Sequence, residues 1–215
     1  MKEGAKEKCY ETIVFDLGNT LIKFDHAISA RKLANLFKID QKKIYDMFFD
    51  STLTHAFEKG LISGREFHAQ ASKMLNIALP YKDFVAIWND IFWEDDAMCA
   101  LARQLKYFYT LFLMTNINRL HFDYLMSKFS IMKIFDEIIP SFVVGSMKPD
   151  RAIFDDAVRR AHGKRHSMLY IDDRDDLVKE ASRLGIDSIR FEGVEPLKRE
   201  LRKRGVLDKR RCEDG

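Results

Sequence analysis

Three short apolar runs, each ending at a polar or acidic side chain, constrain the fold of this chain most strongly. The runs and the side chains that end them are residues 13–15 with Asp16, residues 111–114 with Thr115, and residues 168–171 with Asp172. Short apolar runs of this kind are typical of buried strands. A carboxylate at the end of a buried strand is costly to desolvate unless a partner neutralises it. Ligands of open α/β sheets bind at the carboxyl ends of the strands, so the pattern predicts one shared site there.

Helical and strand-like segments alternate after residue 97. The expected strands lie at 12–16, 109–114, 137–142, 167–171 and 187–191, and the expected helices near 97–106, 119–129, 150–162 and 175–184. Alternation of this kind favours a parallel sheet with right-handed crossovers and helices on both faces. The sequence therefore predicts an α/β fold with a doubly wound parallel sheet.

A different texture separates the first strand from the rest of this pattern. Between residues 25 and 96 the apolar residues recur at helical spacing, and Gly60 and Pro80 divide the stretch into short segments. We expect residues 25–96 to form an all-helical cap over the strand ends. Residues 1–24 and 97–215 would then form one discontinuous α/β core.

Composition limits the cellular setting and the partners of the chain. Its 215 residues suffice for an α/β domain and a modest second unit. Three scattered cysteines do not make a disulfide framework, and free thiols suit a reducing compartment. The first eight residues are rich in Lys and Glu, and no apolar run of about 18 residues occurs. We therefore expect a cytoplasmic protein with no membrane partner.

The net charge of +3 hides a basic carboxyl-terminal segment. Residues 198–211 contain eight Lys or Arg and two acidic residues, but no aromatic side chain that could stack on a base. We interpret the segment as a solvated terminal helix or tail and expect no nucleic-acid partner.

The polar residues at the expected strand ends suit phosphoryl transfer. Asp16 is a candidate nucleophile, and Thr115 and Asn116 offer a hydroxyl, an amide and a backbone N–H to phosphoryl oxygens. Lys148 precedes Pro149, which fixes the local chain and would help to aim the ammonium group. Clustered carboxylates repel unless a cation joins them, and oxygen ligands beside phosphate favour Mg²⁺. The pair Asp172 and Asp173 would complete such a magnesium site.

Four motifs occur in the order and spacing of the haloacid-dehalogenase superfamily. They are Asp16-Leu17-Gly18-Asn19-Thr20, Leu113-Met114-Thr115-Asn116, Met147-Lys148-Pro149-Asp150 and Ile171-Asp172-Asp173. The resemblance spans about residues 12–192. Residues 57–63, 115–121 and 135–139 resemble the branch that holds glucose-1-phosphatases and the phosphatase domain of soluble epoxide hydrolases.

This resemblance implies a Rossmann-like core and a Mg²⁺-dependent phosphatase of a small phosphorylated metabolite, such as a sugar phosphate. An aspartyl-phosphate would form on Asp16, with Lys148 and Thr115 as its catalytic partners. The implied phosphate-binding residues are Thr115, Asn116, Lys148 and Asn19, and the implied metal ligands are Asp16, the Gly18 carbonyl, Asp172 and Asp173.

One position departs from the pattern of most phosphatases in this superfamily. They carry a second Asp two residues after the nucleophile as an acid–base group, and here that position is Gly18. General acid–base catalysis is worth about 10²–10⁴-fold in rate. Either a weakly basic leaving group departs with little protonation, or another group substitutes. Asp25, His121 and a metal-bound water are the candidates.

Three other functions stay open at this point. A 2-haloacid dehalogenase also uses an Asp nucleophile and a Lys, but the clustered Asp172 and Asp173 disfavour it because they oppose ionisation of the nucleophile. Gly18 keeps open a catalytically impaired module that binds phosphate or a protein. A β-phosphoglucomutase-type transferase is disfavoured because its chemistry relies on the missing Asp.

Asp175 is expected to cap the following helix, and Asp176 either caps it or lies in the outer shell of the metal.

Overall fold

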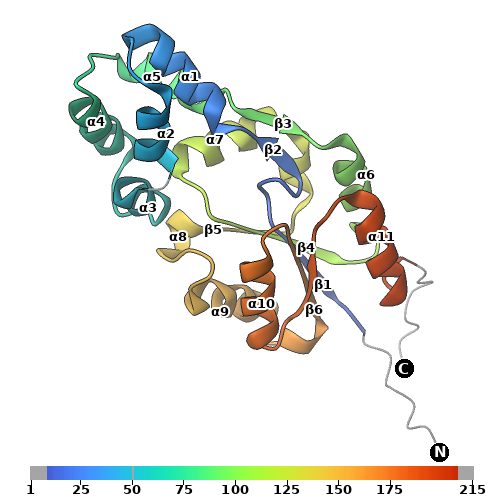
Figure 1. Ribbon diagram of the computed structural model, residues 1–215. Coiled ribbons are helices and arrows are strands. Elements are labelled where there is room, and N and C mark those ends of the chain that lie inside the picture. Colours follow the sequence, from blue (N-terminus) through green and yellow to red (C-terminus); the bar gives the residue numbers. More distant parts are fainter. Residues whose placement is uncertain (1–8, 50, 208–215) are drawn as a thin grey trace, which may run out of the picture.

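A computed structural model describes residues 9–49 and 51–207 of the chain. Its centre is a five-stranded parallel sheet with the strand order β5-β4-β1-β6-β7 (Figure 1). The strands are β1 (Thr12–Phe15), β4 (Thr110–Thr115), β5 (Glu137–Pro140), β6 (Met168–Asp172) and β7 (Asp187–Arg190). Chain order and spatial order differ in the way that a doubly wound sheet requires. The predicted α/β fold is confirmed.

Helices cover both faces of this sheet because its strands alternate apolar side chains between the faces. Phe15 and Leu113 belong to the core under α6 and α11, whereas Val14 and Met114 belong to the core under α9 and α10. The helices that follow the cap are α6 (Asp96–Leu105), α7 (Arg119–Lys128), α8 (Ser141–Val144), α9 (Arg151–Arg160), α10 (Asp175–Arg183) and α11 (Val194–Lys203), with short 3₁₀ turns η1 (Ser130–Ile134) and η2 (Arg165–Ser167). Four of them, α6, α7, α9 and α10, lie within two residues of the predicted helices. The helix α8 and the two 3₁₀ turns were not predicted, and α8 begins inside the strand expected at 137–142. The helix α11 overlaps the basic segment that was interpreted as a terminal helix or tail.

Among the described residues, five helices separate β1 from the other strands of the parallel sheet along the sequence. They are α1 (His26–Phe37), α2 (Gln41–Phe49), α3 (Thr52–Glu58), α4 (Gly64–Leu75) and α5 (Tyr81–Asn89). They enclose an aromatic core of their own that includes Phe57, Phe67 and Trp88. Separate cores on the two sides agree with the predicted cap. The exact bounds of 1–24, 25–96 and 97–215 stay a prediction.

The cap is joined to the sheet by a two-stranded antiparallel ribbon, β2 (Ile22–Phe24) and β3 (Phe92–Glu94). No strand was expected between residues 25 and 96, so the prediction of an all-helical insertion is wrong at β3. Three residues are too few to show a strand period, and the ribbon exists because Phe24 and Phe92 come together through the fold.

The cap also contacts the core beside α3, where Gly60 follows the helix. Gly60 has a φ of +71°, and a Cβ there would collide with the backbone carbonyl of Phe142 in α8. Glycine therefore permits the end of α3 to pack directly on α8 (Figure 1).

The remaining expectations concern membrane spans, the basic carboxyl-terminal segment and the cysteines. No helix among the described residues is long and apolar enough to cross a membrane. Of the basic segment 198–211, the residues to Lys203 end α11. Cys99 is a buried free thiol, and Cys9 is exposed. Residues 1–8, residues 208–211 and Cys212 lie outside the described residues.

Candidate active site

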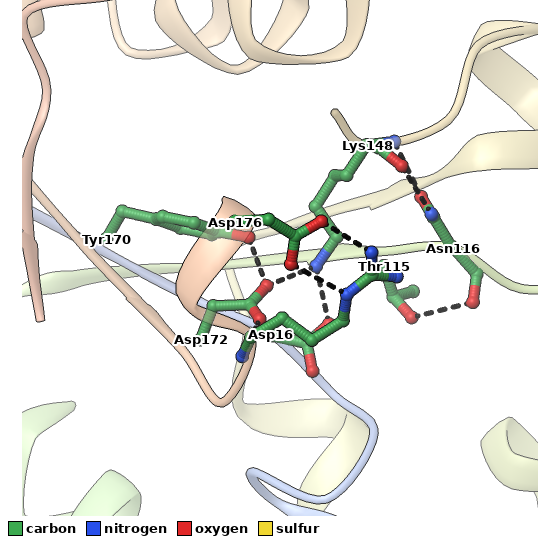
Figure 2. Close-up of polar contacts among 8 residues, drawn as sticks. Asp16, Thr115, Asn116, Lys148, Tyr170, Asp172 and Asp176 are labelled. Carbon is green, nitrogen blue, oxygen red and sulfur yellow. Dashed lines mark hydrogen bonds and ion pairs between the residues drawn. The ribbon is translucent and has the colours of Figure 1, made fainter. Parts of the chain in front are cut away.

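Asp16 lies directly beyond β1, where the parallel strands end, and its carboxylate is buried against Lys148. The Lys148 Nζ donates to Asp16 Oδ1 at 2.6 Å and to Asp172 Oδ2 at 2.7 Å. Figure 2 shows the ammonium group between the two carboxylates. Three segments that are far apart in the sequence therefore meet at the predicted edge of the sheet.

Asp172 ends β6 and has further partners within the protein. Its Oδ2 accepts a short hydrogen bond from the Tyr170 hydroxyl (Figure 2), and its Oδ1 accepts from the Arg174 N–H at 2.9 Å. Tyr170 precedes Asp172 by two residues, so both side chains leave the same face of the strand. This arrangement fixes the orientation of the Asp172 carboxylate.

The carboxylate oxygens of Asp16, Asp172 and Asp173 lie within 4.8 Å of one another. Burial raises the pKa of Asp16 to about 7, Lys148 opposes this rise, and the two neighbouring carboxylates add to it. Burial alone would lower the pKa of Lys148, but its ion pairs with Asp16 and Asp172 outweigh that effect and leave the pKa raised. Three acidic groups thus share one lysine, and the cluster is short of positive charge.

Thr115 and Asn116 lie at the end of β4 and on the loop that follows it. Both line the pocket with Asp16, and the Thr115 side chain is buried. The Asn116 amide is committed elsewhere, because Nδ2 donates to Lys148 O at 2.8 Å and Oδ1 accepts from Lys148 N at 2.7 Å. The side chain of Asn116 therefore holds the Lys148 loop in place, through the contacts shown in Figure 2.

Gly18 and Asn19 make the turn after Asp16, and both line the pocket. Asn19 adopts a left-handed backbone with φ of 56°, which Asn tolerates better than most residues. A Cβ at Gly18 would lie 2.7 Å from Cε1 of Phe24. The Phe24 ring therefore fills the space into which an acidic side chain at position 18 would grow.

The pocket of about 180 Å³ has a cap side and a core side. The wall away from the carboxylates includes Phe24, His26 and Phe92 at or beside the ribbon, together with Glu58 at the end of α3 and His121 on α7. The Phe24 ring lies 4.8 Å from the His26 ring, and the Phe92 ring lies 4.9 Å from the His121 ring. The space beyond the carboxylates is therefore bounded largely by aromatic groups.

Asp25 and His121, the two residues considered as substitutes for an acid at position 18, already make hydrogen bonds within the protein. Asp25 accepts from the N–H of Ala27 at 2.8 Å as the cap of α1, and it is not among the residues that line the pocket. His121 is buried, with Nε2 3.1 Å from Trp88 O and Nδ1 3.0 Å from the Asn118 amide nitrogen. Burial lowers its pKa to about 3, so the ring is neutral at pH 7.

The acidic residues after Asp173 point to structural roles. Asp176 is exposed and pairs with Arg174 at 2.6 Å, and it does not line the pocket. Asp175 pairs with Lys179 at 2.5 Å, and α10 has no side-chain cap. The prediction that Asp175 caps this helix is therefore wrong, because the helix starts one residue too early for Asp175 to serve.

Sequence reasoning missed Tyr170, Glu58 and Phe24 as parts of this site. Tyr170 could have been predicted from the sequence, because the two-residue period of a strand places its side chain on the same face as that of Asp172. Glu58 and Phe24 carry no such signal, since only the folding of the cap and ribbon brings them to the pocket.

Comparisons with known proteins agree with this geometry. The family model described as haloacid dehalogenase-like hydrolase matches residues 13–191. D-ribitol-5-phosphate phosphatase of Bacteroides thetaiotaomicron is 23% identical over 203 residues, which are 89% of this chain and 96% of that protein.

Two solved structures share the fold. A HAD family enzyme of B. thetaiotaomicron, in complex with magnesium and inorganic phosphate, has a TM-score of 0.76 at 23% identity, covering 84% of this chain and 93% of its own. L-2-haloacid dehalogenase of Xanthobacter autotrophicus, with chloropropionic acid covalently bound, has a TM-score of 0.61 at 17% identity, covering 90% and 83%. Because the family model spans most of the chain and all but the start of the parallel sheet, this chain belongs to the haloacid dehalogenase-like hydrolases.

Proposed function

We propose that this protein is a Mg²⁺-dependent phosphatase that hydrolyses a small phosphorylated metabolite through an aspartyl-phosphate on Asp16. The observation that carries the proposal is the convergence of Asp16, Lys148, Asp172 and Asp173 at the rim of one pocket. A nucleophile, a cation and a candidate metal site within a few ångströms are the parts that phosphoryl transfer needs.

Lys148 has two roles in this proposal. Its ammonium group favours the ionised form of Asp16, which is the nucleophilic form, and its contact with Asp172 keeps it directed at that carboxylate pair. Negative charge on a transferring phosphoryl group would be stabilised by the same ammonium. The Asn116 clamp on the Lys148 backbone supports this placement.

The carboxylates fit Mg²⁺ as the resident cation. Opposite ligands of a magnesium ion are about 4.2 Å apart at ordinary Mg–O distances, and the three carboxylates lie within 4.8 Å. A divalent cation would balance the two negative charges that Lys148 leaves uncompensated. We assign Asp16, Asp173, Asp172 and the Gly18 carbonyl to it, and it would supply electrostatic stabilisation of the phosphoryl oxygens.

The remaining site residues receive the phosphate. Thr115 offers its hydroxyl, and Asn116 and Asn19 offer backbone N–H groups or, for Asn19, the side-chain amide. The resemblance to a ribitol-phosphate phosphatase over nearly the whole length of both chains supports a phosphorylated polyol or sugar as the substrate. The cap over the strand ends would select it.

A haloacid dehalogenase is the second candidate, because the dehalogenase from X. autotrophicus shares the fold at lower similarity. The three clustered carboxylates count against it, since halide displacement needs no metal and gains nothing from two further acidic groups.

The test is phosphate release from a panel of sugar, polyol and aryl phosphates, with Mg²⁺ and with EDTA. We expect turnover that requires Mg²⁺ and that falls about 10⁴-fold or more in Asp16→Asn, because the nucleophile is lost. Chloride release from 2-chloropropionate without phosphate release would establish the dehalogenase instead. Silence with every substrate would overturn both activities.

A further inference from the structure

Among the described residues that line the pocket, few titratable groups can protonate a leaving group. Asp16 and the pair Asp172 and Asp173 are assigned to the nucleophile and the metal, and Lys148 is ion-paired. Arg174 pairs with Asp176 and stays charged. One cap carboxylate, Glu58, has none of these commitments.

The two histidines at the pocket are poor acids. Burial lowers the pKa of His26 to about 4, with the nearby Asp25 opposing, and lowers that of His121 to about 3. Both rings are therefore neutral near pH 7 and hold no proton that they release readily to an alkoxide.

The backbone of Glu58 is connected through Ser141 to the loop that follows β4. The buried Ser141 hydroxyl donates to Glu58 O at 2.6 Å and accepts from Ile117 N at 3.0 Å. Ile117 follows Thr115 and Asn116 on the loop after β4. A single serine thus ties the end of α3 to the loop that is expected to hold the phosphate, and the close packing of Gly60 on Phe142 strengthens the same contact.

Glu58 is one of the residues that line the pocket with Asp16. Among the described residues, the Glu58 carboxylate makes no hydrogen bond and no ion pair. The charged groups on the adjoining elements are engaged elsewhere, with Lys59 bound to Asp150 and Arg65 lying over the Tyr81 ring. The segment of α8 that packs on α3 has no titratable side chain.

We propose that Glu58 is the general acid that protonates the leaving oxygen of the substrate, in the role that an Asp at position 18 would otherwise fill. The inference rests on the proposed phosphatase function. It also explains why Phe24 can occupy the space beside Gly18 without loss of an acid, since the acid comes from the cap.

The step balances without a further reactant. A carboxylate oxygen of Asp16 forms a bond to phosphorus as the bond from phosphorus to the ester oxygen breaks. That oxygen takes the proton of the Glu58 carboxyl group and leaves as an alcohol, and the Glu58 carboxylate later regains a proton from solvent. Burial raises the pKa of Glu58 to about 7, so a protonated fraction is present at neutral pH.

The experiment compares kcat/KM for three esters in wild type, Glu58→Gln and Glu58→Asp, with saturating Mg²⁺. The esters are p-nitrophenyl phosphate, which has a good leaving group, ethyl phosphate, which has a poor one and no hydroxyls, and ribitol 5-phosphate, which has a poor one and several hydroxyls. The ratio kcat/KM reports steps up to phosphorylation of Asp16, so later hydrolysis does not obscure the result. Asp46→Asn, on the exposed face of α2, is the matched control.

We expect Glu58→Gln to lower kcat/KM about 10²-fold or more for both alkyl esters and less than about threefold for the aryl ester. Glu58→Asp should recover part of the loss. For alkyl esters the wild-type ratio should fall as the pH rises above about 7, and Glu58→Gln should lack this fall.

Other outcomes overturn the inference in distinguishable ways. A loss confined to ribitol 5-phosphate would make Glu58 a hydroxyl-binding residue, and an equal loss for all three esters would give it a structural role. Wild-type activity on the aryl ester alone would also refute a general acid for alkyl leaving groups. Absence of activity on every ester would overturn the proposed phosphatase itself.

Discussion

The two sides of the pocket differ in their electrostatics: the core side is built from ion-paired groups, and the other side from groups that are neutral or have a raised pKa. On the core side, Asp16 and Asp172 are buried, and each accepts from the Lys148 ammonium group, at 2.6 Å and 2.7 Å respectively. On the opposite wall of the pocket, the half-buried His26 and the buried His121 are neutral near pH 7, and the pKa of Glu58 is raised by burial.

This difference separates two parts of the chemistry. Paired charges at the strand ends suit binding and transfer of a phosphoryl group, since they are preorganised for negative charge. The neutral histidines suit an uncharged leaving group, and in the proposal above Glu58 keeps a proton available. In the proposed function, the cap would select the alcohol that leaves, and the core would transfer the phosphoryl group.

The largest effect is expected from removal of Lys148, which supplies the positive charge on the core side of the pocket. In Lys148→Met the buried carboxylates of Asp16 and Asp172 lose their shared cation, so the free energy of unfolding should fall by about 3–5 kcal/mol without metal. Denaturant unfolding with EDTA measures the loss. Mg²⁺ should recover part of it, and Asp16→Asn in the same chain should recover part without metal. Unchanged stability would show that the cluster is not short of positive charge.

The neutral histidines give the next largest effect, through pH. Both have folded-state pKa values below the ordinary value of about 6.5, so their contribution to stability is complete above that pH and is lost as the pH falls toward about 4 and about 3. Urea unfolding of wild type and His121→Gln between pH 6.5 and 4 isolates one ring. The wild type should lose about 1.4 kcal/mol more per pH unit than the variant. Parallel profiles would mean that His121 is protonated in the fold.

A side chain at Gly18 should test the boundary between the two sides. Gly18→Asp brings a Cβ to 2.7 Å from the Phe24 ring, so we expect a destabilisation of about 1–3 kcal/mol. Phe24→Leu in the same chain should relieve most of it in thermal unfolding. If Gly18→Asp alone is as stable as wild type, the Phe24 ring does not restrict this position.

The smallest effect is expected at Asp176, which lies outside the pocket. Its carboxylate is exposed and binds Arg174 at 2.6 Å, so Asp176→Asn should change Mg²⁺-dependent turnover by less than about twofold. Titration of activity with Mg²⁺ checks this. A tenfold or greater weakening of the Mg²⁺ response would place Asp176 in the outer shell of the metal.

Local pattern was sufficient for the core and insufficient for the cap. The strands ending near Asp16, Thr115 and Asp172 were predicted within one or two residues, because a buried parallel strand must be apolar along its whole length. The three residues of β3 carry no such pattern. Their strand exists only because β2 is beside them.

The sequence by itself determined the order of the strands along the chain, and the identities of the side chains at their ends. Tertiary structure decided which of these side chains meet, and it alone brought Glu58 to the pocket wall and Phe24 against Gly18. The physical reason is that strand ends are set by short-range burial, whereas the cap wall is assembled from separate elements, namely the β2–β3 ribbon, α3 and α7. Contacts such as Ser141 with Glu58 carry no local signal, because they form only when the cap closes on the sheet.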